Sequence, residues 1–255
     1  MLRSLRLLLA TALVFPFAGC ETIGNLNLYS DDELEPLSAQ AYAEVATEYT
    51  EIKSGAQYEM VRRVAQKIAA ASEENFAWEV KLLKADDTPN AFCLPNGRIA
   101  VYTGILPLTQ NENGLAAVLG HEVAHAVLRH GGKRMTQGLL TNVAATAIDA
   151  GLGIAEMSED TRGVVMGVIG AGAQYGVLLP YSREHESEAD ILGIRYAIRA
   201  GYDPNEAPKL WERMAELGSG TPEWMSTHPH PLARAEKLRE VIPQIIEEEK
   251  NWQPK

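Results

Sequence analysis

The pentapeptide His-Glu-Val-Ala-His at positions 121–125 decides how the rest of the chain is interpreted. It lies among apolar residues at helical spacing, and a helix places side chains four residues apart about 40° apart on one face. His121 and His125 can therefore bind one zinc ion together. Glu122 projects in a neighbouring direction, where its carboxylate can take a proton from an attacking water. This HExxH pattern predicts a metallohydrolase site on a helix.

A third metal ligand has to come from elsewhere, because a catalytic zinc usually has three protein ligands and one open position. The acidic segment Arg-Glu-His-Glu-Ser-Glu-Ala-Asp at 183–190 is the candidate. If it is helical, Glu186 and Asp190 share a face, whereas Glu184 and Glu188 point about 160° away from Glu186. One carboxylate would bind the metal and the other would accept the Nδ1 proton of a liganding histidine. The alternative is a solvated acidic helix start.

The apolar pattern around these motifs predicts an α+β fold that is mainly α-helical. Helical spacing covers residues 38–53, 58–71, 113–131, 184–200, 204–217 and 231–248. In Trp78–Leu83 apolar and charged residues alternate, which predicts a strand. The Asn96-Gly97 turn predicts a β-hairpin within 90–103. We expect this small sheet to lie beside the helix that carries HExxH.

Two stretches of small residues set further expectations. Glycine commonly follows the last turn of a helix, so the HExxH helix is expected to end at Gly131-Gly132. Residues 135–181 are rich in Ala, Gly, Val and Leu and are expected to form closely packed helices that cover the cleft as an inhibitory lid. Residues 163–182 contain no charged residue. A membrane-inserted segment is therefore the alternative to closely packed helices.

Four separate motifs, which occur in the same order as in a known family, make the sequence similar to that family. They are HExxH, the Ser182-Arg183 to Asp190 stretch with its ExxxD core, the hairpin segment 90–104, and Ser-Thr-His-Pro at 226–229 followed by Arg234. Together they resemble the gluzincin metalloendopeptidases of the HtpX and CAAX prenyl protease family over about residues 38–245. Within that family the chain is similar to the periplasmic lipoprotein branch of the BepA and LoiP type, and we expect no C-terminal repeat domain. The resemblance implies a zincin-like metallopeptidase fold.

The resemblance also implies a role for each residue of the metal site. One zinc ion per chain would be held by His121, His125 and Glu186, with Glu122 moving the proton. The substrate would bind as an extended strand beside the hairpin, through Asn90, Ala91 and Phe92.

His228 is implied to lie near the metal, where a protonated imidazole would stabilise the oxyanion of the tetrahedral intermediate. Arg234 would hold His228 or its loop by paired hydrogen bonds, and Asp190 would support a ligand from behind. The alternative for His228 is a local structural role in its Pro-flanked loop. The remaining candidates, His130, His185 and His230, are expected to be structural.

The N-terminus indicates export. Residues 1–19 have a basic start, a short apolar run and small residues, as in a secretory signal peptide, and Cys20 then resembles the lipidated cysteine of bacterial lipoproteins. Phe17 departs from the usual leucine of that motif, and the alternative is an ordinary secretion signal with an incidental cysteine. Residues 20–37 are expected to be an acidic tether and 38–255 a single domain. Glu21 favours the outer membrane, with the inner membrane as the alternative.

Composition limits the partners. The 255 residues carry a net charge of −11, which argues against a nucleic-acid partner, and two cysteines are too few for a disulfide framework. We expect a zinc endopeptidase of the bacterial cell envelope that hydrolyses misfolded or unassembled envelope proteins. The alternative is a lipid-anchored periplasmic chaperone or assembly factor that uses the same fold without significant proteolysis.

Overall fold

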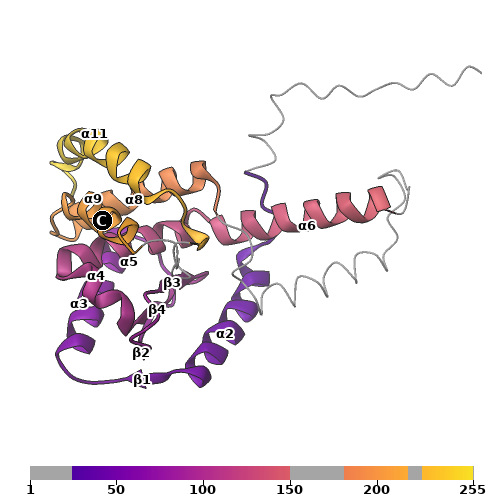
Figure 1. Cartoon of the computed structure of the whole chain (residues 1–255), viewed down its shortest axis with the longest axis horizontal. Helices are drawn as coiled ribbons and strands as arrows, with labels where there is room; N and C mark the ends of the chain where they lie inside the picture. The colour runs from indigo at the N-terminus through magenta and orange to yellow at the C-terminus, as the bar shows by residue number, and fades with distance from the viewer. Residues whose placement is uncertain (1–24, 150–180, 218–225, 255) are drawn as a thin grey trace, which may run out of the picture.

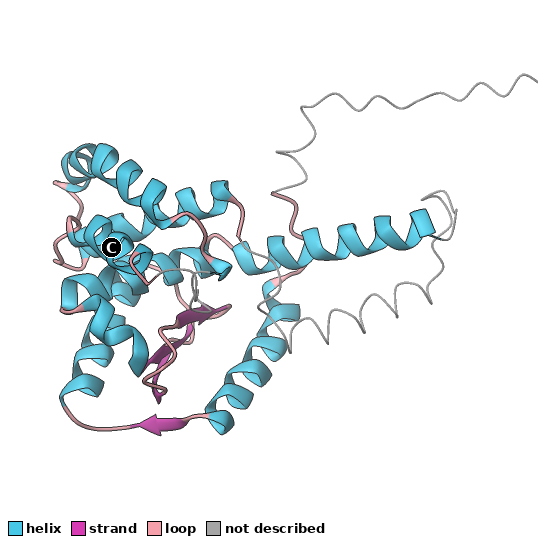
Figure 2. Ribbon diagram, in the orientation of Figure 1, coloured by secondary structure: helices cyan, strands magenta, loops and turns pink. Residues whose placement is uncertain are grey.

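The structure is a computed structural model, and it describes residues 25–149, 181–217 and 226–254 (Figure 1). These residues form a mainly helical α+β domain, as the sequence predicts (Figure 2). The helices are α2 (Asp31–Glu48), α3 (Ala56–Ser72), the 3-10 turn η1 (Thr103–Ile105), α4 (Leu106–Thr109), α5 (Glu112–Val127), α6 (His130–Asp149), α8 (Arg183–Arg199), α9 (Glu206–Ala215) and α11 (Pro231–Glu249). The strands are β1 (Thr50–Ile52), β2 (Glu79–Lys84), β3 (Ala91–Leu94) and β4 (Arg98–Tyr102).

The four strands form one sheet in the order β1-β2-β4-β3. Strands β3 and β4 are the predicted hairpin, with Ala91 opposite Val101. Its turn uses positive φ at Asn96 (65°) and Gly97 (86°), the conformation that the Asn-Gly pair favours. Strand β2 runs parallel to β4, so β3 is left at the edge of the sheet. That edge strand packs against α5.

Helix α5 is the centre of the domain. Its side chains are buried from Gly114 to Ala126, because the sheet and α3 cover one side and α8 and α9 the other (Figure 1). Glycines allow α5 and α8 to approach closely: a Cβ on Gly193 of α8 would lie 2.7 Å from the backbone nitrogen of His121. This contact brings the acidic first half of α8 against HExxH.

The end of the HExxH helix is predicted wrongly. Helix α5 ends at Val127, and the chain turns at Arg129, which has a left-handed φ of 56°. The two expected terminal glycines lie instead in the first turn of α6. Gly132 serves a close approach, since a Cβ there would meet the Asn27 side-chain oxygen at 2.6 Å. The turn between α5 and α6 therefore uses a non-glycine residue in the left-handed region, and arginine is not a residue type that predicts such a turn.

The first helix also begins earlier than expected. Ser30 and Glu33 form a capping box that starts α2 at Asp31, so residues 31–37 are not a tether but the first turns of a packed helix. Leu34 and Tyr42 are buried, and the Tyr42 hydroxyl donates to the Ile99 carbonyl at 2.8 Å. The C-terminal end of the helix expected over residues 38–53 is instead strand β1.

Several predictions fall outside the described residues. The signal peptide, Cys20 and residues 150–180 of the expected lid belong to this group. The part of 135–181 that precedes residue 150 is helical in α6, which projects from the body of the domain (Figure 1). Among the described helices, none combines the length and apolar character that a membrane crossing needs.

Candidate metal centre

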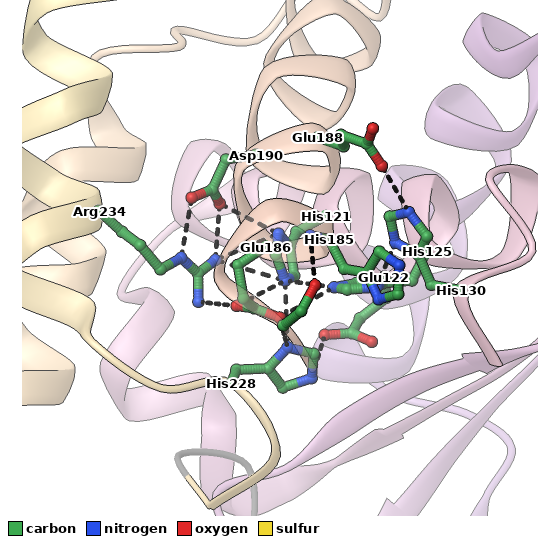
Figure 3. A network of polar contacts seen from close by, with 11 residues as sticks. His121, Glu122, His125, His130, His185, Glu186, Glu188, Asp190, His228 and Arg234 are labelled. Atoms are coloured by element: carbon green, nitrogen blue, oxygen red, sulfur yellow. Dashed lines mark hydrogen bonds and ion pairs between the residues drawn. The ribbon is translucent and has the colours of Figure 1, made fainter. Parts of the chain in front are cut away.

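Three elements bring four buried donors together. Helix α5 supplies His121 and His125, α8 supplies Glu186, and the loop before α11 supplies His228 (Figure 3). One ligand atom from each lies within 4.8 Å of all the others. Ser182 is the N-cap of helix α8, and its hydroxyl accepts a hydrogen bond from the His185 backbone nitrogen. The sequence-predicted ligands therefore converge, although they are some 60 residues apart along the chain.

The separations fit a single zinc ion. The Nε2 atoms of His121 and His125 are 3.0 Å apart, and Glu186 lies 3.3 Å from His125 Nε2 and 3.7 Å from His121 Nε2. Tetrahedral ligands about 2.0–2.1 Å from a zinc ion lie about 3.3 Å from one another. Two imidazole nitrogens and a carboxylate are also the ligand types that zinc prefers. The residues present thus fit the metal.

The Nδ1 atom of His121 contacts a carboxylate that an arginine holds in place. Asp190 Oδ1 lies 3.1 Å from His121 Nδ1. Arg234 donates to both oxygens of Asp190, from Nε at 2.8 Å and from Nη2 at 2.6 Å, and its Nη1 lies 2.6 Å from Glu186 Oε2. The paired hydrogen bonds that we expected Arg234 to give to His228 or its loop therefore go to Asp190. The guanidinium in turn lies over the Trp211 ring at 4.3 Å.

These contacts set the ionisation states that a metal site needs. Burial is the largest single influence and would raise the pKa of Glu186 and of Asp190. The charge of Arg234, together with the hydrogen bonds and the neighbouring histidines around each carboxyl, outweighs burial, and the pKa of each is lowered. Burial, with the neighbouring His121, holds the pKa of His125 well below its usual value. The two carboxyls are therefore anionic and His125 is neutral, as ligation requires.

His228 faces both the metal ligands and the candidate base. Its Nδ1 lies 3.0 Å from Glu186 Oε1 and 3.2 Å from His121 Nε2, whereas its Nε2 lies 3.5 Å from Glu122 Oε1. We expected His228 near the metal, and the structure adds that it offers a fourth donor atom. Its role at the oxyanion stays a prediction. His230 is exposed at the start of α11.

The expected substrate strand lies at the sheet edge beside this site. Ala91 and Phe92 belong to β3, and the carbonyl of Asn90 accepts from the Tyr102 backbone nitrogen at 3.0 Å. Glu122 is buried on the helix that packs against β3. The helix that carries the predicted base therefore packs directly against the predicted substrate strand. Their use by a substrate stays a prediction.

Two residues at the site were not predicted to take part in it. The Tyr181 ring stacks on the His125 ring, with centroids 4.0 Å apart. His130 Nδ1 lies 2.9 Å from His125 Nδ1, although helical geometry continued past Val127 would place His130 on the opposite face. The break at Arg129 turns it back. No local sequence pattern announces this approach, because Arg129 is not a residue type that marks a left-handed turn.

Comparisons with known proteins agree with this geometry. Residues 53–242 match peptidase family M48. The chain is 35% identical over 233 residues to mitochondrial metalloendopeptidase OMA1 of Schizosaccharomyces pombe, which is 87% of this chain and 66% of that protein. It is 30% identical over 167 residues to the beta-barrel assembly-enhancing protease of Yersinia pestis, which is 60% and 32% of the two chains. The chain thus spans about a third to two thirds of the length of these relatives.

Proposed function

Because the chain belongs to peptidase family M48, we propose that it is a zinc-dependent endopeptidase of the bacterial cell envelope that hydrolyses misfolded or unassembled envelope proteins. The observation that carries the proposal is the meeting of His121, His125 and Glu186 at mutual distances suited to one metal ion, with Glu122 next to them in the helix. When bound, zinc would polarise the scissile carbonyl and the attacking water.

The protein's own residues would do the rest of the chemistry. Glu122, which is buried, would take the proton of the attacking water and pass it to the leaving amine. His228, whose Nε2 lies 3.5 Å from Glu122 Oε1, would donate a hydrogen bond to the oxyanion. Arg234 would keep Glu186 and Asp190 ionised and fixed in place.

The edge strand β3 supports an extended-substrate mode. A peptide added at this edge would be held mainly by backbone hydrogen bonds around Asn90, Ala91 and Phe92. Such bonds recognise an unfolded strand more than a particular sequence. This suits a protease that acts on misfolded chains.

The proposed cellular setting is the bacterial envelope, and two observations support it. The leader-like residues 1–19 and Cys20 support lipid anchoring at the periplasmic face of the outer membrane, with the inner membrane as the alternative. The name of the Yersinia pestis relative links a similar chain to β-barrel assembly, whereas other relatives are mitochondrial. Unassembled envelope proteins are therefore the proposed substrates.

The test is cleavage of casein by the purified chain, with and without phenanthroline. We expect fragments that phenanthroline abolishes, and we expect Glu122→Gln to cleave at least 100-fold more slowly while it retains one zinc per chain. Glu184→Gln, at an exposed position two residues before Glu186, is the matched control and should cleave normally. Unchanged cleavage by Glu122→Gln would refute the mechanism, and protection of the client without fragments would favour the chaperone alternative.

A further inference from the structure

A hydrogen-bonded chain leads from the metal site to the protein surface through residues that the mechanism above does not use. His130 Nδ1 lies 2.9 Å from His125 Nδ1, and His130 Nε2 lies 3.0 Å from Glu188 Oε2 (Figure 3). The His130 side chain is fully buried, whereas that of Glu188 is 40% exposed. The three residues come from α5, α6 and α8, so the chain also joins three helices at one point.

The partners fix where each proton sits. A carboxylate only accepts, so the Nε2 of neutral His130 carries the proton and donates it to Glu188. Nδ1 of His130 is then an acceptor, and the short contact requires that His125 Nδ1 be the donor. This leaves a lone pair on Nε2 of His125, the atom that faces Glu186 and His121. With His130 neutral, each of the two hydrogen bonds in the chain then has one donor and one acceptor.

We propose that His130 and Glu188 are positioning residues that hold His125 in the tautomer and orientation that bind the metal through Nε2. The inference rests on the zinc site of the proposed function and extends it to a second layer of residues. His185 supports the ring of His130 by stacking on it, with centroids 4.2 Å apart and planes inclined by 20°. His121 receives the same support directly from Asp190, whereas His125 receives it through an imidazole.

The test measures zinc affinity by competition with a chromophoric chelator. Glu188→Ala and His130→Leu should each weaken zinc binding by about 10- to 100-fold, as loss of such partners does at other zinc sites. His130→Gln should restore much of the affinity, because its amide can accept from His125 and donate to Glu188. The double variant His130→Leu with Glu188→Ala should bind no more weakly than His130→Leu alone, since Glu188 acts only through His130.

Two further readings separate positioning from a general structural role. The visible absorption spectrum of the cobalt-substituted protein should change in His130→Leu and return toward that of the wild type in His130→Gln. Glu184→Gln, on the same helix and exposed, should leave affinity and spectrum unchanged. Glu188 is partly exposed, so its variant tests the idea even if His130→Leu does not fold.

Wild-type zinc affinity in Glu188→Ala, or additive losses in the double variant, would overturn the proposal. Failure of the wild-type chain to bind zinc at all would instead refute the proposed function. The two failures are therefore distinguishable in one experiment.

Discussion

The close contact between Gly120 of α5 and Gly193 of α8 joins the two helices that supply His121, His125 and Glu186, and Gly193→Ala tests how far the metal site depends on it. An added Cβ at Gly193 would lie 2.7 Å from His121 N and 2.8 Å from Gly120 C, against the 3.4 Å at which ordinary contact begins. Both neighbours are backbone atoms of a buried helix and cannot rotate away. Helix α8 would therefore have to move from α5 by about 0.7 Å.

That displacement acts directly on the ligand set. Glu186 belongs to α8, whereas His121 and His125 belong to α5, and zinc–ligand distances tolerate only about 0.2 Å of error. We expect Gly193→Ala to weaken zinc binding by at least about 10-fold and to lower the free energy of unfolding by about 1–3 kcal/mol. Chelator competition and urea unfolding of the metal-free protein measure the two quantities separately.

The matched control is Gly131→Ala. Gly131 lies in the first turn of α6, and a Cβ there would meet no atom within 4 Å. This variant should keep its zinc affinity and be neutral or slightly stabilised. If Gly193→Ala kept both wild-type affinity and wild-type stability, the close helix approach would not be what positions Glu186.

Two other predictions concern the charges of the site. Arg234→Met should destabilise the metal-free protein by about 3–5 kcal/mol in urea unfolding, because it leaves the buried Glu186 and Asp190 without their cation; a loss below 1 kcal/mol would contradict this. Burial lowers the pKa of His125, and that of His130 to about 2, so below about pH 6.5 only the unfolded chain takes up their protons. Metal-free stability should then fall by up to about 1.4 kcal/mol per pH unit for each imidazole between pH 6.5 and 5, before the carboxyls with lowered pKa contribute below about 4.5; a flat profile would contradict it.

Much of the framework could be predicted because its signals are local. The spacing of His121 and His125 and that of Glu186 and Asp190 each require only one helix, and both helices form. The Asn96-Gly97 turn needs two residues with positive φ, which that pair adopts readily, and it forms the predicted hairpin.

The rest depends on contacts that no local pattern reveals. Gly132 resembles a helix stop, but it lies inside α6, where the side chain of Asn27, more than 100 residues away along the chain, packs closely against it. The left-handed turn at Arg129 has no glycine to announce it, and it precedes His130, whose ring contacts His125. Tyr181, whose ring stacks on that of His125, lies more than 50 residues further along the chain. The local patterns therefore predicted which side chains converge at the candidate metal centre, but not several of the contacts that hold those side chains.

Anomalous X-ray scattering at the zinc edge, from crystals of the zinc-loaded protein, tests the central claim most directly. The account predicts one anomalous peak per chain, about 2.0–2.2 Å from Nε2 of His121, Nε2 of His125 and a carboxylate oxygen of Glu186. A peak held by other side chains, or no peak at this point in a zinc-loaded crystal, would contradict it.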